Sequence, residues 1–207
     1  MISFSKTDIQ KLPHLHKINL INSIAGYKSA NLIGTKSIDG ISNVAVFSSV
    51  VHYGSSPAIL GFVIRPTSVP RNTYENIKSS QVYTINSITE NNFKDAHHTS
   101  AKYPPDVSEF EKTNLKEEYK NDFKAPFVKN APLQLAMKFL EEYHIKANNT
   151  ILVLGEVENI FLQPELLESD FFVNLSKGKV ATINGLDSYT TPQTPFRLPY
   201  QRPKQEL

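Results

Sequence analysis

Short runs of apolar and β-branched residues, separated by turn residues, fill the middle of the chain. The residues joining the first two runs end in Asp39-Gly40, and this dipeptide between apolar runs is a strong hairpin signal. In the fourth run, apolar and polar side chains alternate as in a half-buried strand. The pattern predicts strands at residues 30–35, 41–51, 58–64, 81–88 and 150–162.

Residues 133–140 fit two patterns. Leu133, Leu135, Met137 and Phe139 alternate as in a strand, whereas the apolar side chains also recur at helical spacing. The sequence leaves both structures open here.

Three segments predict helices. Asn72 followed by Glu75 indicates an N-cap with a reciprocal carboxylate, opening a short helix that runs through Lys78. Ser108–Glu111 repeats this pattern and predicts a helix on the surface, and Pro164–Leu167 predicts one helical turn.

The remaining segments give the domain organisation. Residues 1–28 are an N-terminal lead-in with a patchy helical period, and residues 29–203 form one domain. Within it, the polar segment 91–128 is expected to be an insertion of helices and loops over the mouth of a barrel. The tail, residues 187–207, contains four prolines and is expected to wrap the surface without regular structure.

The strand count and hairpin spacing favour a mainly β fold, a small antiparallel barrel with short attached helices.

Composition excludes several classes of protein. Among 207 residues there is no cysteine, so disulfides, thiolate metal sites and cysteine nucleophiles are ruled out. The net charge of +2 comes from interspersed charges, unlike the basic face of a nucleic-acid-binding protein. The start of the chain lacks the order of a secretory signal, and the longest apolar run, Ile59–Ile64, is too short to cross a bilayer. We therefore expect a soluble, cytoplasmic protein that binds neither nucleic acid nor membrane.

Several catalytic motifs are missing from the sequence. The glycines never form a Gly-x-Gly pair, so neither a Rossmann fingerprint nor a Walker loop is present. The six histidines include no metalloprotease arrangement, which makes a zinc site improbable. A triad drawn from His97, Ser100 and an aspartate lacks the nucleophile elbow of hydrolases, and a solvated polar loop is the simpler interpretation.

One set of residues does point to a ligand. The predicted strand at 41–51 contains Ser48-Ser49, two hydroxyls where a strand should be leaving the sheet. Arg65, Arg71 and Thr73 lie near the helix that opens at Asn72. Fixed cations, a hydroxyl and a free helix N-terminus are what a phosphate monoester needs.

The order of these segments resembles a known family. Asn43–Ser49, Pro57–Pro66, Arg71–Ile77 and Tyr83–Asn86 look like the flavin reductase-like proteins of the FMN-binding split-barrel group. The flavoredoxin-like branch is similar over further pieces, namely Ala96–Pro104, Ser108–Phe110, Gly155–Val157, Gly185–Tyr189 and Tyr200–Pro203. No single piece is specific, and the resemblance rests on the ordered series from about Ser29 to Pro203.

The resemblance implies a six-stranded antiparallel split barrel, a homodimer, and FMN near the subunit interface. Asn43 to Ser49 would line the isoalloxazine ring, with Ser48 and Ser49 reaching towards the ribityl-phosphate, and Arg65 with Thr73 would bind the phosphate. Tyr189 would close the site from the C-terminal segment. The full set of cofactor-binding residues implied is Asn43, Val44, Ala45, Phe47, Ser48, Ser49, Arg65, Arg71, Thr73, Asn86, His97, Thr99, Ser100, Lys102 and Tyr189.

Two positions depart from the family pattern. Asn72-Thr73 stands where Asp-Thr is common, and Gly34-Thr35 stands where paired threonines are common. Gly34 removes a side chain and leaves that wall of the expected site open.

The function implied is an oxidoreductase in which NADH or NADPH, as a transient donor, passes a hydride to bound FMN. Lys102 is the one candidate catalytic residue, since its charge can stabilise the negative charge of the reduced ring. A non-enzymatic FMN carrier or sensor remains the main alternative. An oligonucleotide-binding barrel ranks low, because residues 41–51 and 58–64 contain no lysine or arginine.

Overall fold

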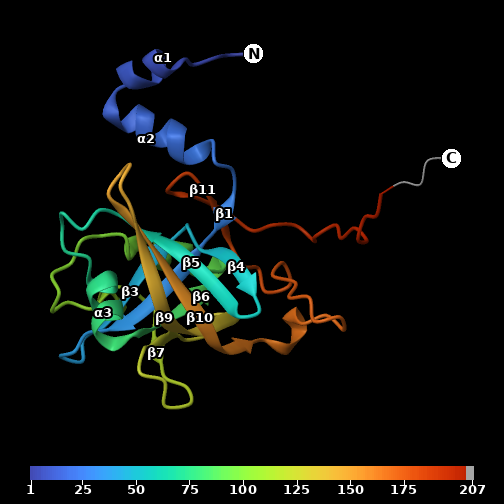
Figure 1. Ribbon diagram of the computed structural model, residues 1–207. Helices are drawn as coiled ribbons and strands as arrows, with labels where there is room; N and C mark the ends of the chain where they lie inside the picture. The colour runs from blue at the N-terminus through green and yellow to red at the C-terminus, as the bar shows by residue number, and fades with distance from the viewer. Residues whose placement is uncertain (204–207) are drawn as a thin grey trace.

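The protein is built around one curved antiparallel sheet of seven strands, seen in the computed structural model, which describes residues 1–203 (Figure 1). The last four residues of the expected proline-rich tail lie outside the described residues. The strand order is β3-β2-β6-β9-β10-β5-β4. The strands are β2 (Asn31–Lys36), β3 (Ser42–Phe47), β4 (Val51–Ser55), β5 (Ala58–Ile64), β6 (Val82–Ser87), β9 (Leu133–Ile145) and β10 (Thr150–Leu162).

The mainly β fold and the antiparallel split barrel are confirmed, with one strand more than expected. Residues 133–145 form a strand, which settles the ambiguity in that segment. The expectation of one strand over 41–51 is wrong, because the chain bends at 48–50 and continues as β4. At the bend, Ser49 Oγ accepts a hydrogen bond from the Val63 N–H (3.0 Å). The serine side chain thus takes the place of the backbone carbonyl that would accept this bond in a continuous strand.

Both faces of β2 are buried. Leu32 and Ile33 are neighbours on β2, yet they pack into two different apolar clusters, and neither side chain is exposed. The cluster inside the barrel is formed by Ile33, Phe62, Tyr83, Met137 and Val153 with their neighbours. On the other face, Leu32 and Val44 pack against Phe110 and Val128, so the 91–128 segment contributes to the core.

Three short α-helices flank the sheet: α3 (Asn72–Ser80), α4 (Phe93–His98) and α5 (Glu109–Lys112). The N-cap of α3 is Arg71, and no side chain caps it, so the predicted capping by Asn72 and Glu75 is wrong. Asn72 is the first residue inside the helix, and the first N–H groups of α3 are left without a side-chain partner.

The helix α5 is also different from its prediction. Ser108 does cap it, by accepting a hydrogen bond from the Phe110 N–H (3.3 Å). Glu111 makes no reciprocal bond, and Glu109 and Phe110 are buried, so this is not a surface helix. Phe110 belongs to the apolar core, which draws the helix inward.

Smaller elements complete the chain. The predicted turn after Pro164 is the 3₁₀ helix η2 (Pro164–Leu166), and a second one, η1 (Glu90–Asn92), precedes α4. Two small sheets form, one from β1 (Lys28–Ser29), β11 (Thr182–Asn184) and β12 (Ser188–Thr190), the other from β7 (Glu117–Glu118) and β8 (Phe127–Val128). No helix in residues 1–203 has the length and apolarity needed to span a membrane.

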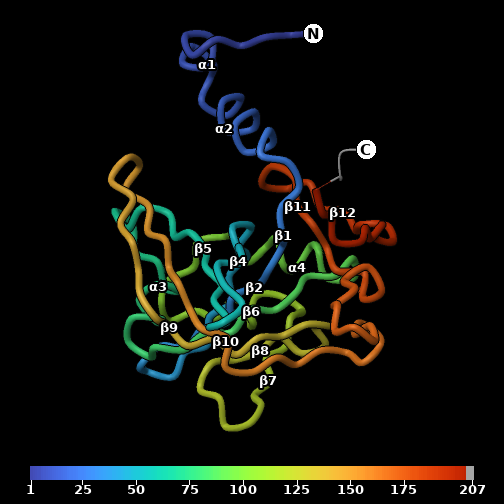
Figure 2. Tube along the Cα trace, turned by 45° about the vertical axis from the view of Figure 1, so that its right-hand side comes forward, coloured from blue at the N-terminus to red at the C-terminus, as the bar shows by residue number. Residues whose placement is uncertain are grey.

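The two ends of the chain leave the barrel. The lead-in forms α1 (Lys6–Lys11) and α2 (His14–Ser23), which bury no residue and project away from the sheet in both views (Figures 1 and 2). The tail was expected to lack regular structure from residue 187, but Ser188–Thr190 form β12; residues 191–203 have no regular structure, as expected. These residues do not wrap the barrel, although Arg197 pairs with Asp170 (2.7 Å) and lies over the ring of Phe172 (Figure 1).

Candidate functional site

A cavity of about 780 Å³ lies where the end of β3, the start of α3 and residues 97–109 meet. Twelve of the fifteen residues expected to bind a cofactor line it. They are Asn43, Ala45, Phe47, Ser48, Ser49, Arg65, Arg71, Thr73, His97, Thr99, Ser100 and Lys102. A smaller cavity of about 330 Å³, beside the tip of the β9–β10 hairpin, contains none of them.

The other three residues lie outside the cavity. The Val44 side chain is in the core, and Asn86 is fully buried, donating to the Leu32 carbonyl (3.1 Å) and accepting from the Val128 N–H (2.9 Å). Asn86 therefore joins the sheet to the 91–128 segment.

Tyr189 does not line the cavity but packs against His97, which does. Its ring stacks on Phe93 and meets the ring of His97 edge-on, with centroid distances of 5.3 and 5.8 Å. Its hydroxyl lies 3.4 Å from His97 Nδ1. Burial, helped by the nearby charge of Asp187, raises the pKa of Tyr189 to about 12, so its hydroxyl stays protonated and His97 is held by a neutral phenol.

One end of the cavity carries groups that favour the binding of an anion. Arg71, Asn72 and Thr73 bring the uncapped N-terminus of α3 to the cavity wall, where its N–H groups and helix dipole favour negative charge. Arg71 Nε donates to the Pro66 carbonyl (3.3 Å), which fixes that guanidinium, while Arg65 is exposed at the rim.

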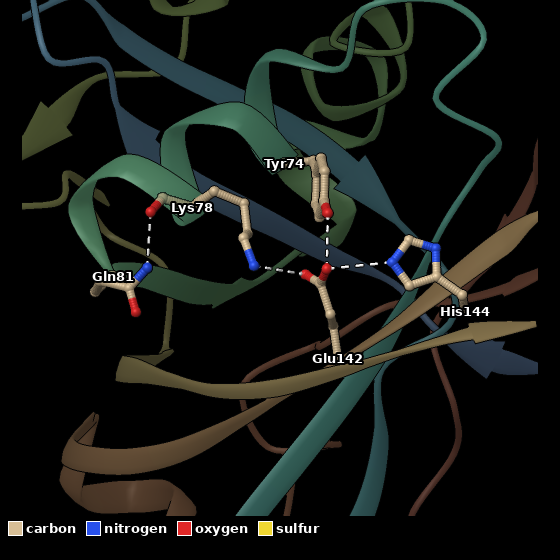
Figure 3. A network of polar contacts seen from close by, with 5 residues as sticks. All are labelled: Tyr74, Lys78, Gln81, Glu142 and His144. Atoms are coloured by element: carbon tan, nitrogen blue, oxygen red, sulfur yellow. Dashed lines mark hydrogen bonds and ion pairs between the residues drawn. The ribbon is translucent and has the colours of Figure 1, made fainter.

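The far side of α3 is anchored to β9 by one carboxylate (Figure 3). Glu142 accepts hydrogen bonds from the Tyr74 hydroxyl (2.9 Å) and the Lys78 ammonium (3.1 Å), and His144 Nε2 lies 3.3 Å away. Burial opposes ionisation of Glu142, but these three partners outweigh it and lower its pKa. The helix that carries Thr73 is thus tied to the sheet by a charged contact.

Not every hydroxyl lining the cavity is free to bind a ligand. The Ser49 hydroxyl bonds the backbone of Val63, and Thr99 Oγ1 donates to the Ala96 carbonyl (2.7 Å). Within residues 1–203, Ser48 and Ser100 have no hydrogen-bond partner for their hydroxyls, so these two can turn towards a ligand.

Glu109 is an acidic lining residue that the sequence reasoning missed. It is only 4% exposed, and in the described chain it is the only acidic side chain on the cavity. Its Oε2 accepts a hydrogen bond from the Val44 N–H (3.0 Å). Burial raises the pKa of Glu109, against the lowering effect of the N–H groups of Val44 and of its own backbone. The apolar Phe110 beside it was the available signal for burial.

Asn43 connects Glu109 to the anion end. Its amide lies between Thr73 Oγ1 and Glu109 Oε2. In one orientation its nitrogen donates to Glu109 Oε2 (3.3 Å), and its oxygen accepts from Thr73 Oγ1 (3.2 Å) and from the Val44 N–H (3.2 Å). In the other, its nitrogen donates to Thr73 Oγ1 (3.2 Å) and its oxygen faces Glu109.

Gly34 is not a wall of this cavity, contrary to expectation. A Cβ placed there would lie 2.2 Å from the Pro126 carbonyl oxygen and 2.6 Å from Thr84 Oγ1. The missing side chain lets the 91–128 segment approach the sheet, where Thr84 donates to that carbonyl (2.6 Å).

Comparisons with known proteins agree with this architecture. Residues 28–181 match the family described as flavin reductase like domain. A proposed flavin reductase with a split barrel domain from Shewanella frigidimarina NCIMB 400 is 41% identical, covers 97% of this chain and 100% of its own, and superposes with a TM-score of 0.94.

Two more distant structures share the fold. The flavoredoxin of Desulfovibrio vulgaris (Miyazaki F) is 16% identical, with 83% of this chain and 90% of that chain covered and a TM-score of 0.72. An FMN-binding protein from Thermus thermophilus is 13% identical, with 96% and 100% covered and a TM-score of 0.74.

Proposed function

Because the chain belongs to the flavin reductase like domain family, we propose that it binds FMN in this cavity and catalyses hydride transfer to it from NADH or NADPH. The observation that carries the proposal is the meeting of Thr73, two arginines and the uncapped start of α3 at one end of a cavity of about 780 Å³.

The residues present fit a phosphorylated aromatic cofactor. Small-molecule sites have volumes of roughly 300–1,000 Å³, and this cavity lies within that range. Ala45, Val46 and Phe47 offer an apolar wall along β3, and Ile183 and Leu186 add to it from the C-terminal segment. An apolar wall with a cationic end suits a flat ring that carries a phosphate.

Each group then has a distinct task. Arg65, Thr73 and the N–H groups of α3 bind the phosphate, while the end of β3 holds the ring. The flavin supplies the electron-carrying chemistry. Lys102 contributes a positive charge on the cavity wall that stabilises negative charge gained on reduction.

Two measurements test this function. Oxidation of NADH or NADPH in the presence of FMN should depend on the protein, whereas a carrier or sensor would bind FMN without turnover. Replacing both Arg65 and Thr73 with alanine should weaken FMN binding by at least tenfold while changing riboflavin binding little. Equal losses for the two ligands would contradict the phosphate assignment.

We also propose that two copies associate. The helices α1 and α2 contain no fully buried residue, and a ten-residue helix is only marginally stable without packing. Leu15 and Ile24 are more than two-thirds exposed, and Asn22, at the end of α2, lines the cavity. A second copy packed on α2 would cover these side chains next to the site.

A further inference from the structure

The orientation of the Asn43 amide and the protonation of Glu109 are linked by hydrogen-bond chemistry. An ionised Glu109 can only accept, so it favours the orientation in which the Asn43 nitrogen faces it. The Thr73 hydroxyl then donates its proton to the Asn43 oxygen, so this proton is not available to a ligand in the cavity.

A protonated Glu109 reverses this arrangement. Its hydroxyl donates to the Asn43 oxygen, and the Asn43 nitrogen donates to Thr73 Oγ1 (3.2 Å). Thr73 then accepts from within the protein, and its own proton can point into the cavity. The Val44 N–H, which also donates to the Asn43 oxygen in the first arrangement (3.2 Å), keeps its bond to Glu109 Oε2 (3.0 Å) in the second.

We propose that Glu109 is a positioning residue which, when protonated, turns the Thr73 hydroxyl through Asn43 towards the anionic group of the ligand. Binding of a phosphorylated ligand therefore takes up one proton from solvent onto the Glu109 carboxylate. This inference rests on the proposed function, because it takes the phosphate to lie at Thr73. It adds that the cavity binds the phosphorylated flavin more tightly as the pH falls.

The surroundings of Glu109 favour proton uptake when an anion enters. Within residues 1–203 no cation forms an ion pair with its carboxylate, and β3, on which α5 packs, has no charged residue from Ser42 to Phe47. A phosphate bound at Thr73 places a second negative charge in the same enclosed space, which favours the neutral acid. The other titratable or charged side chains lining the cavity are Arg65, Arg71, His97, Lys102 and Tyr103, and α5 itself carries the exposed Glu111 and Lys112.

Calorimetric titration in two buffers of different ionisation enthalpy measures the protons taken up. At pH 7.5 the wild type should take up more protons with FMN than with riboflavin, which lacks the phosphate. The ratio of FMN to riboflavin affinity should fall by up to about tenfold per pH unit above neutrality. Glu109→Gln should abolish the extra uptake and flatten the ratio, and the matched control Glu111→Gln, exposed on the same helix, should behave as the wild type.

Equal uptake in the wild type and Glu109→Gln would overturn the proposal, as would a flat wild-type ratio. If neither flavin binds the wild type, the proposed function fails instead, so the two failures are distinguishable. Should Glu109→Gln not fold, Thr73→Val and Thr73→Ser provide the test with Glu109 intact. The pH dependence should be weaker in Thr73→Val and restored in Thr73→Ser, whereas equal slopes would overturn the role of the hydroxyl.

Discussion

Gly155 on β10 lies directly against the hydroxyl of Tyr83 on β6, with β9 between the two strands. A Cβ placed on Gly155 would stand 2.2 Å from that oxygen and 2.9 Å from the Lys138 carbonyl oxygen. Tyr83 is fully buried, and within residues 1–203 its hydroxyl has no hydrogen-bond partner. Burial accordingly raises the pKa of Tyr83. The close packing of Tyr83 against β10 inside the barrel therefore requires a residue without a side chain at position 155.

Gly155→Ala should lower the free energy of unfolding by about 1–3 kcal/mol, because the added methyl group overpacks the interior. Tyr83→Phe should cost little, since it removes a hydroxyl that is buried without a partner. Urea denaturation of both single variants and the double variant measures the coupling. Gly155→Ala should be less damaging in the Tyr83→Phe background, and an equal cost in both backgrounds would show that the hydroxyl is not the obstacle.

Glu142→Gln should reduce stability at neutral pH by about 1 kcal/mol, a small amount because the Lys78 side chain is 42% exposed. The folded pKa of Glu142 lies below its ordinary value near 4.5, so its contribution is present above that pH and is lost as the pH falls through the folded pKa. Thermal unfolding from pH 3 to 7 should show the two proteins converging at the acid end. Glu158→Gln, an exposed residue of β10, is the control. A difference that persists unchanged at pH 3 would exclude the ionic contribution.

The sequence predicted the features that depend on local pattern. Alternation and turn residues located five of the seven strands of the main sheet and left β9 open between strand and helix. The resemblance to the flavin reductase-like family is confirmed. The break after Phe47 was missed because Ser48 and Ser49 are compatible with a strand, and only the contact of Ser49 with Val63 shows why the chain bends.

The site was less predictable because it depends on contacts between distant segments. Glu109 and Thr73 are 36 positions apart along the chain and are joined through Asn43. Asn86 matched a motif, yet its amide is committed to the sheet. Gly34 seemed to face the ligand, whereas it faces Pro126 from the 91–128 segment. No local pattern in the sequence reports these contacts.

Lys102→Met should slow the reduction of bound FMN by NADH or NADPH about tenfold and leave the FMN dissociation constant nearly unchanged. Lys102 lines the cavity and, within the described chain, forms no ion pair, so its charge is available to the ligand. Stopped-flow absorbance of the flavin measures the rate, and fluorescence quenching measures binding. Lys94→Met, on α4 outside the cavity, is the control. An unchanged rate together with unchanged affinity would remove Lys102 from the mechanism.

Replacing Leu15 and Ile24 with aspartate should convert a dimer into monomers. Both side chains are exposed within one chain, at 69% and 68%, and a charge at either position would have to be desolvated in an apolar contact between copies. Because Asn22 lines the cavity, losing the packing of α2 should also weaken FMN binding, by about tenfold. Light scattering after size exclusion gives the mass, and Asn19→Asp, an exposed polar residue of α2, controls for added charge. If the double variant keeps the mass of the wild type, α2 does not form the contact between copies.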